Sequence, residues 1–220
     1  MNRTMNSLLI CVALISLSGV ALADATFVIA DPPVACGVID MVPFDGNGDS
    51  GPYDFDTVIL GTTGEKRAMA EFDLSTITIP AGEVIESATY EVQIYSNYVG
   101  GLGCPYGQVP DTMAVDGYVG NGVEELSDFQ AGTGNFLARV DSSEVVYLSV
   151  LSFDVSEFVA GLIANGDQYA GLTLRAEQVG GVSVWDGIAG YPKLTITTTV
   201  PEPTSLALLA LGAMGFIRRR

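Results

Sequence analysis

One loop (DGNGDSGPYDFD) carries the residue spacing that most suggests chemistry. Asp45, Asn47 and Asp49 stand at positions 1, 3 and 5 of a calcium-binding loop, and Asp56 falls at position 12. Oxygen ligands that alternate with glycines allow the backbone to curl around a hard cation. Ser50 stands where such loops carry glycine, and no helical pattern flanks the segment. Two interpretations follow: a calcium site formed by these four ligands, or an acidic turn without a metal.

Most catalytic systems lack their essential residues in this chain. It contains no histidine, which excludes Ser-His-Asp and Cys-His nucleophiles and the usual zinc sites. The sequence also has no G-x-S-x-G motif, phosphate-binding loop or dinucleotide-binding fingerprint. Carboxylates are plentiful, so a glycosidase with two paired acids stays open as an alternative. We predict no enzymatic activity and assign no catalytic residue.

Aromatic side chains offer a route to carbohydrate binding, because their rings stack on the apolar faces of sugars. Four tyrosines lie close together in the sequence: Tyr95, Tyr98, Tyr106 and Tyr118. Each is either a platform for a sugar or part of the packing at the rim of the core, and the second role is the more frequent one. The single tryptophan, Trp185, has the same two interpretations.

Two cysteines remain for a disulfide once Cys11 is lost with the N-terminal segment. An even pair in an exported protein is typical of a disulfide. A bridge between Cys36 and Cys104 would close a loop of about 70 residues and would stabilise the fold by ~2–4 kcal/mol. We predict this disulfide, with two separate thiols as the alternative.

The N-terminus has the parts of a secretory signal peptide. Arg3 supplies the positive charge, and residues 8–17 (LLICVALISL) form a short apolar run. The small-x-small rule allows cleavage after Ala23 (Ala-Leu-Ala) or after Ala25 (Ala-Asp-Ala). Residues 1–23 are therefore predicted to be a signal peptide. A retained anchor is less favoured, because the run is shorter than the ~20 residues of a membrane span.

The region between the targeting segments is strongly acidic. The chain has 9 basic and 26 acidic side chains, but Arg3, Glu202 and the three terminal arginines lie outside residues 24–199. That range keeps 5 basic and 25 acidic groups, a net charge of −20. Such a surface repels phosphate backbones, which excludes nucleic acid as a partner.

Strand patterns dominate the acidic region. Residues 67–74 (RAMAEFDL) and 88–95 (ATYEVQIY) alternate between apolar and polar, which predicts strands with one buried face. Residues 147–155 (YLSVLSFDV) are apolar on both faces, which predicts a central strand. Further strands are predicted at 26–30, 57–61, 112–119, 171–176 and 193–199. The segments 31–56 and 96–111 are expected to be irregular.

One helix interrupts the strands. Ser156 is its expected N-cap, apolar residues recur with helical spacing from 158 to 163, and Asn165-Gly166 forms its C-terminal stop. The sequence therefore predicts an all-β fold: a single β-sandwich domain at 24–199 with one short helix. An N-terminal signal helix and a C-terminal apolar helix are expected on either side.

The order of these elements resembles the DNRLRE-type β-sandwich domains of secreted bacterial proteins, from about residue 57 to 199. The matching segments are RAMAEFDLS (67–75), IESATYEVQIY (85–95), LSFDVSEFVAGLIANG (151–166), AGLTLRAE (170–177) and YPKLTI (191–196). Some members of that family are treated as carbohydrate-binding modules. The resemblance therefore implies a jelly-roll-like sandwich and a carbohydrate ligand such as exopolysaccharide. The tryptophan that is usual in the middle of the family pattern is replaced here by VEELSDFQ (123–130).

The C-terminus has three parts in a fixed order. They are Pro201, Glu202 and Pro203, then the apolar run 204–217 (TSLALLALGAMGFI), then Arg218, Arg219 and Arg220. The prolines keep the first part extended. The apolar run is predicted to span a membrane, and the arginines stay cytoplasmic by the positive-inside rule.

This tail resembles the PEP-CTERM sorting signal. The resemblance implies that an exosortase, an integral-membrane protease, recognises and cleaves it at the inner membrane. We therefore predict a non-enzymatic exported protein of the cell surface or extracellular matrix. The alternatives are a carbohydrate-binding module for exopolysaccharide and a polysaccharide hydrolase or lyase.

Overall fold

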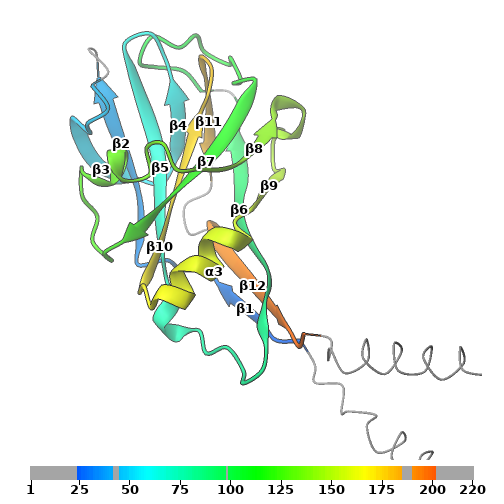
Figure 1. Ribbon diagram of the computed structural model, residues 1–220. Coiled ribbons are helices and arrows are strands. Elements are labelled where there is room, and N and C mark those ends of the chain that lie inside the picture. Colours follow the sequence, from blue (N-terminus) through cyan, green and yellow to red (C-terminus); the bar gives the residue numbers. More distant parts are fainter. Residues whose placement is uncertain (1–23, 42–44, 98, 185–189, 202–220) are drawn as a thin grey trace, which may run out of the picture. The chain divides into compact units, whose positions relative to one another are not determined.

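The fold is all-β, as the strand patterns predict. The computed structural model describes residues 24–41, 45–97, 99–184 and 190–201, and the compact unit runs from Ala25 to Pro201 (Figure 1). The predicted signal peptide (1–23) and apolar membrane segment (204–217) lie outside the described residues, as do Tyr98 and Trp185.

Within the described residues, twelve strands form a single antiparallel sheet. They are β1 (Thr26–Ile29), β2 (Val34–Met41), β3 (Ser50–Asp54), β4 (Thr57–Leu60), β5 (Gly64–Asp73), β6 (Val84–Ser96), β7 (Thr112–Gly120), β8 (Phe136–Asp141), β9 (Val150–Asp154), β10 (Tyr169–Ala176), β11 (Gly180–Val184) and β12 (Lys193–Thr199). The helical elements are η1 (Leu74–Thr76), α2 (Asp128–Ala131), η2 (Ser142–Glu144) and α3 (Ser156–Asn165).

The sheet curls so that its two halves enclose one apolar core. Its main path runs β1-β12-β6-β11-β4-β5-β10-β7-β8, while β2 and β3 extend from β5, and β9 pairs with β6. The ring of Tyr90 on β6 lies 5.8 Å from the ring of Phe72 on β5 and 6.0 Å from that of Phe153 on β9. Full burial of such side chains contributes roughly 1.5–3 kcal/mol each. The core is thus sandwich-like, but it is enclosed by one continuous sheet.

β6 and α3 follow the sequence pattern closely. On β6 the predicted inward residues Ala88, Tyr90, Val92 and Ile94 are all fully buried, and the residues between them are not. The predicted C-terminal limit of α3 is confirmed, and Gly166 ends the helix with a left-handed φ of +79°.

The N-cap of α3 differs from the prediction. The N-cap position is Val155 rather than Ser156, and the Ser156 N–H donates to Asp154 Oδ1 at 3.0 Å. The Ser156 hydroxyl instead accepts the backbone N–H of Ala88 at 2.8 Å, which ties the start of α3 to β6. The Ser156 hydroxyl therefore binds a neighbouring strand and does not cap its own helix.

The prediction of a central strand at 147–155 is wrong. β9 begins only at Val150 and forms a ladder with β6 alone. Leu151 and Phe153 face the core, whereas Tyr147 and Val150 are exposed. The outward residues of β9, Val150, Ser152 and Asp154, are exposed because β9 lies at an edge of the curled sheet. Four strands were not predicted at all, namely β2, β3, β8 and β11.

β5 departs from its predicted one-sided burial. Met69 and Glu71 point away from the main core, yet both are fully buried. Residues 121–135, here called the cover segment, lie over this face and include α2, which contacts β2, β5 and β7. Phe129 of α2 packs with Met69 and three residues of β2 in a second small core (Val34, Cys36 and Val38). The cover segment thus encloses a second, smaller apolar core on the outer face of the sheet.

Candidate binding groove

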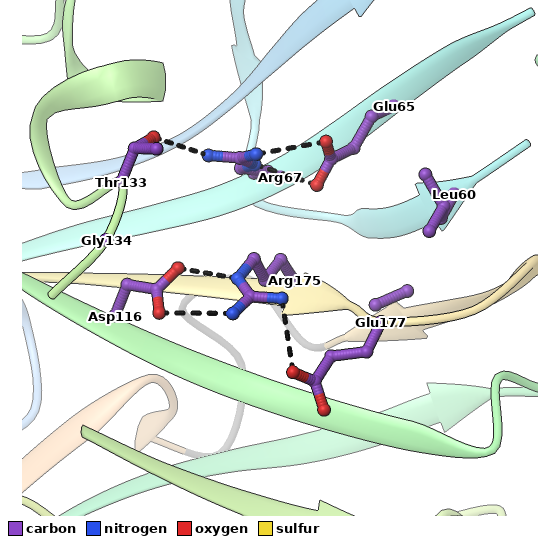
Figure 2. A pocket seen from close by; sticks show the side chains of 9 residues that line it. Leu60, Glu65, Arg67, Asp116, Thr133, Gly134, Arg175 and Glu177 are labelled. Carbon is purple, nitrogen blue, oxygen red and sulfur yellow. Dashed lines mark hydrogen bonds and ion pairs between the residues drawn. The ribbon is translucent and has the colours of Figure 1, made fainter. Parts of the chain in front are cut away.

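A polar groove of about 240 Å³ lies on the outer face of the sheet, beside the cover segment. Alternate residues of a strand point to the same face, so three neighbouring strands place their charged side chains together. These side chains are Glu65 and Arg67 of β5, Asp116 of β7, Arg175 of β10, and Glu177 immediately after β10. Figure 2 shows the two guanidinium groups near each other, each flanked by carboxylates. Thr133 and Gly134 of the cover segment complete the lining.

Arg67 joins the sheet to the cover segment. Its Nε and Nη2 donate to the two carboxylate oxygens of Glu65 at 2.8 and 3.0 Å. Its Nη1 donates to the carbonyl of Phe129 at 2.9 Å and to Thr133 Oγ1 at 3.1 Å. The guanidinium also lies 4.1 Å from the centre of the Phe129 ring, at the distance of a cation–π contact. The Arg67 side chain therefore connects β5, in the sheet, to the cover segment beside the groove.

Arg175 holds the second charge pair. Its Nε and Nη2 donate to the carboxylate of Asp116 at 2.5 and 3.3 Å, and its Nη1 reaches Glu177 Oε1 at 3.5 Å. Burial lowers the pKa of Arg175, but the hydrogen bond and charge of Asp116, with the charge of Glu177, outweigh it and the net shift is upward. The Asp116 side chain is only 3% exposed, so this pair is nearly desolvated.

The basic side chains are matched by carboxylates. Of the five in residues 24–199, Arg67 of β5 and Arg175 of β10 line the groove. Arg139 of β8 reaches Glu177 from the side, and Lys66 alternates with Arg67 on β5 and so points to the opposite face. Each has a carboxylate partner: Lys66 meets Asp56 at 2.5 Å and Arg139 meets Glu177 at 3.4 Å. The groove therefore presents neutralised donors and acceptors, which suits a polar, uncharged ligand better than a strong anion.

Beneath the cover segment lies a buried acidic cluster. Glu71 is fully buried, and its Oε2 accepts the backbone N–H groups of Asn121 and Gly122 at 3.0 and 2.6 Å. Asp128 of α2 is 3% exposed. Burial is the main cause that raises the pKa of Asp128 to about 6, and the charges of Glu71, Glu125 and Glu124 add to it, against a hydrogen bond from the Glu125 N–H. Asp128 thus binds its proton more tightly in the folded protein than a free aspartic acid does.

The predicted disulfide is not present. Cys36 and Cys104 are both free and buried. Cys36 pairs across the ladder with Met69, whereas the loop holding Cys104 lies against the start of β5, where Leu102 meets Gly64. Those two points on β5 are five residues apart, or ~16 Å along a strand, and a disulfide requires Cα atoms within ~7 Å. The alternative of two separate thiols is the one observed.

Burial also makes the Cys36 thiol unreactive. Desolvation raises its pKa to about 12, and the charges of Asp128, Glu124 and Glu71 add to the shift. Because the thiolate is the reactive form, Cys36 acts here as a small apolar side chain in the second core.

The four predicted calcium ligands are not brought together as the loop pattern requires. Asp45 Oδ1 accepts the Asn47 N–H at 3.0 Å and Asp49 Oδ2 accepts the Met41 N–H at 2.8 Å, so both carboxylates serve the turn. β3 then continues in extended form, and Asp56 at its far end binds Lys66 instead. In the part of the chain that the structure describes, no group of three or more acidic or cysteine side chains is placed to hold a metal ion.

The tyrosines divide between surface and interior. Tyr95 and Tyr106 are exposed, whereas Tyr118 is buried under the cover segment and is not available to stack on a sugar. Burial raises the pKa of Tyr118 strongly. The charged groove, by contrast, was missed by sequence reasoning. The sequence did contain an indication of this groove: Glu65 with Arg67, and Arg175 with Glu177, are opposite charges two residues apart. In an extended chain, residues with this spacing lie on the same face.

Of the predicted sorting residues, Pro201 is described, and it is exposed two residues after the end of β12. Glu202, Pro203, Arg218, Arg219 and Arg220 lie outside the described residues. Among the helices that the structure describes, none is long and apolar enough to cross a membrane.

Comparison with known proteins assigns the tail. Residues 199–220 match the PEP-CTERM protein-sorting motif. No protein of curated function matches the chain. The motif covers only the C-terminal end, so it identifies a sorting route for the domain that precedes it. The protein carries a PEP-CTERM sorting motif, and this supports an exported protein that passes through a membrane and is processed by an exosortase-type system.

Proposed function

We propose that this protein is a non-enzymatic component of the cell surface or extracellular matrix, cleaved by an exosortase during export. The observation that carries the proposal is the sorting motif, which begins at the last residue of β12. A domain delivered in this way is left outside the cell, where its net charge of −20 for residues 24–199 keeps it soluble.

The charge pairs favour a non-enzymatic role over a glycosidase. A glycosidase needs one carboxylic acid with a raised pKa beside an ionised partner, both open to the substrate. In the groove, Glu65, Asp116 and Glu177 already accept hydrogen bonds or charge contacts from arginines. Among the described carboxyl groups, burial raises the pKa of Asp40 and Asp128, and both of these side chains are enclosed.

Deletion of residues 201–220 tests the sorting role. We expect the shortened protein to leave the membrane fraction and to be found folded in the periplasm or medium, because β12 ends at Thr199 and stays complete. Fractionation with immunoblotting and circular dichroism measures both properties. As a control, Arg67→Lys in the full chain should leave the fractionation unchanged. A shortened protein that remains in the membrane, or that has lost its β-structure, would contradict the proposal.

A second candidate function, carbohydrate binding, is favoured by the groove itself. Planar guanidinium groups and carboxylates side by side offer both donors and acceptors to sugar hydroxyls, and the volume of about 240 Å³ suits one sugar unit of a chain.

The same protein can be assayed for turnover and for binding. We expect no release of reducing sugars from a panel of polysaccharides. If a glycan binds, Glu177→Gln should weaken it at least several-fold, while Glu91→Gln should not. Glu91 is a matched control because it also pairs with a cation, Lys193, but on the other half of the sheet. Turnover abolished by one Asp or Glu substitution would favour the hydrolase alternative instead.

A further inference from the structure

The two ends of the compact unit are hydrogen-bonded to each other. β1 pairs with β12 from Thr26 opposite Thr197 to Ile29 opposite Leu194 (Figure 1). One residue further out, the Thr198 N–H donates to the carbonyl of Ala25 at 2.8 Å, and the Thr198 hydroxyl donates to the same oxygen at 3.3 Å. Thr198 is fully buried, so its N–H depends on a protein acceptor.

This contact distinguishes the two candidate signal cleavage points. Cleavage after Ala23 leaves Asp24 as the first residue and keeps the Ala25 carbonyl in place. Cleavage after Ala25 removes that carbonyl and leaves the charged amino group of Thr26, a donor, at the new end of the ladder. The buried Thr198 N–H would then lack its acceptor, at a cost of about 1–3 kcal/mol. Only the first product completes the fold.

The same pair limits the position of the sorting cut. β12 is hydrogen-bonded on both edges, to β1 and to β6, and its last residue, Thr199, pairs with Val84. A protease binds its substrate as an extended segment, through backbone groups that must be free. Before the apolar run begins at Thr204, the sequence has only Val200 to Pro203 outside the ladder. A cut before the end of Pro203 would leave three residues or fewer between the ladder and the cut, so the end of β12 would have to leave the sheet to enter the protease.

We propose that the β1–β12 pair fixes both ends of the mature protein: the signal is removed between Ala23 and Asp24, and the sorting cut follows Pro203 or a later residue. At the first bond, water adds its hydroxyl to the Ala23 carbonyl and Asp24 keeps the amine. At the second, the acyl carbon passes to water or to an acceptor amine, and the apolar tail leaves with a free amino terminus. The inference rests on the export and sorting proposed above.

Mass spectrometry tests both ends at once on protein expressed from the full-length gene in an exosortase-containing bacterium. The intact mass and the terminal peptides of the exported protein should give Asp24 as the first residue and Pro203 or a later residue as the last, with or without an acceptor. A mature chain that starts at Thr26, or that ends before Pro203, would overturn the inference while leaving the proposed function intact. An uncleaved chain would overturn both.

Two signal variants give an independent measurement. Ala21→Asp damages only the site that ends at Ala23, because Ala21 is the small residue three positions before that cut. Ala25→Val damages only the alternative site, and valine suits an edge strand while the backbone carbonyl is kept. We expect uncleaved precursor to accumulate with Ala21→Asp and normal processing to Asp24 with Ala25→Val. The reverse pattern would show that Ala25 is the cleavage point.

Discussion

Replacement of Arg175 by methionine should destabilise the protein by about 3–5 kcal/mol. Asp116 accepts hydrogen bonds from this guanidinium at 2.5 and 3.3 Å, and its side chain is 3% exposed. Without Arg175 the carboxylate stays between β7 and β10 with no comparable partner, and an uncompensated buried charge costs more than the lost attraction alone. Thermal unfolding followed by circular dichroism should show a melting temperature lower by about 10 °C.

Lys193→Met is the matched control for this prediction. It breaks the Lys193–Glu91 pair, which has a similar distance of 3.0 Å but side chains that are 26% and 20% exposed. Removal of such a partly hydrated pair should cost about 1 kcal/mol or less. The double variant Arg175→Met with Asp116→Leu should recover most of the lost stability, because no buried charge remains. Equal, small losses in both single variants would mean that water reaches Asp116.

Replacement of Asp128 by asparagine should stabilise the protein at neutral pH. Burial and the nearby carboxylates raise the pKa of Asp128 from 3.8 to about 6, so the folded state binds this proton more tightly than the unfolded state. Below about pH 4 the group is neutral in both states and costs nothing. Between pH 4 and 6 only the unfolded state ionises, and stability falls. Above pH 6 the full penalty applies, on the order of 2 kcal/mol.

The Asp128→Asn variant removes this penalty and can keep the hydrogen bond from the Glu125 N–H to the side-chain oxygen. Urea unfolding at pH 4 and at pH 7.5 should therefore show little difference from wild type at the lower pH and a gain at the higher one. Asp111→Asn, on the exposed surface, changes the net charge equally and should not alter the pH profile. A pH profile of stability that is as steep in Asp128→Asn as in the wild type would contradict this prediction.

Elements whose pattern is local were predictable from the sequence. The period-two alternation on β6 gives the right buried face, because one face of that strand meets the core and the other meets solvent. α3 ends where the sequence predicts, since that limit depends on residues within a few positions, such as Gly166. β9 shows the limit of this reasoning. Apolar residues on both faces indicate a buried strand only if a second layer exists, and the curled sheet leaves β9 at an edge.

The calcium site stays a prediction that the structure does not support, for a similar reason. The spacing of Asp45, Asn47, Asp49 and Asp56 describes a ligand set only if the backbone curls into a loop. Here the chain continues into β3, which pairs with β2 across a bulge, and Asp56 meets Lys66, ten residues further along. The types of these residues alone did not reveal that Lys66 would bind Asp56 in place of a cation.

By itself, the sequence determined the all-β character and the C-terminal sorting motif. Both are read along the chain: strand periodicity from neighbouring residues, and the motif from the order of its proline, apolar and arginine parts. Only the tertiary structure decided which charges meet and which stay buried. Asp116 and Arg175 are 59 positions apart, and Glu71 meets Asn121 across 50. Such pairs depend on the register of strands that are distant in sequence, and a register is chosen by the packing of the whole sheet.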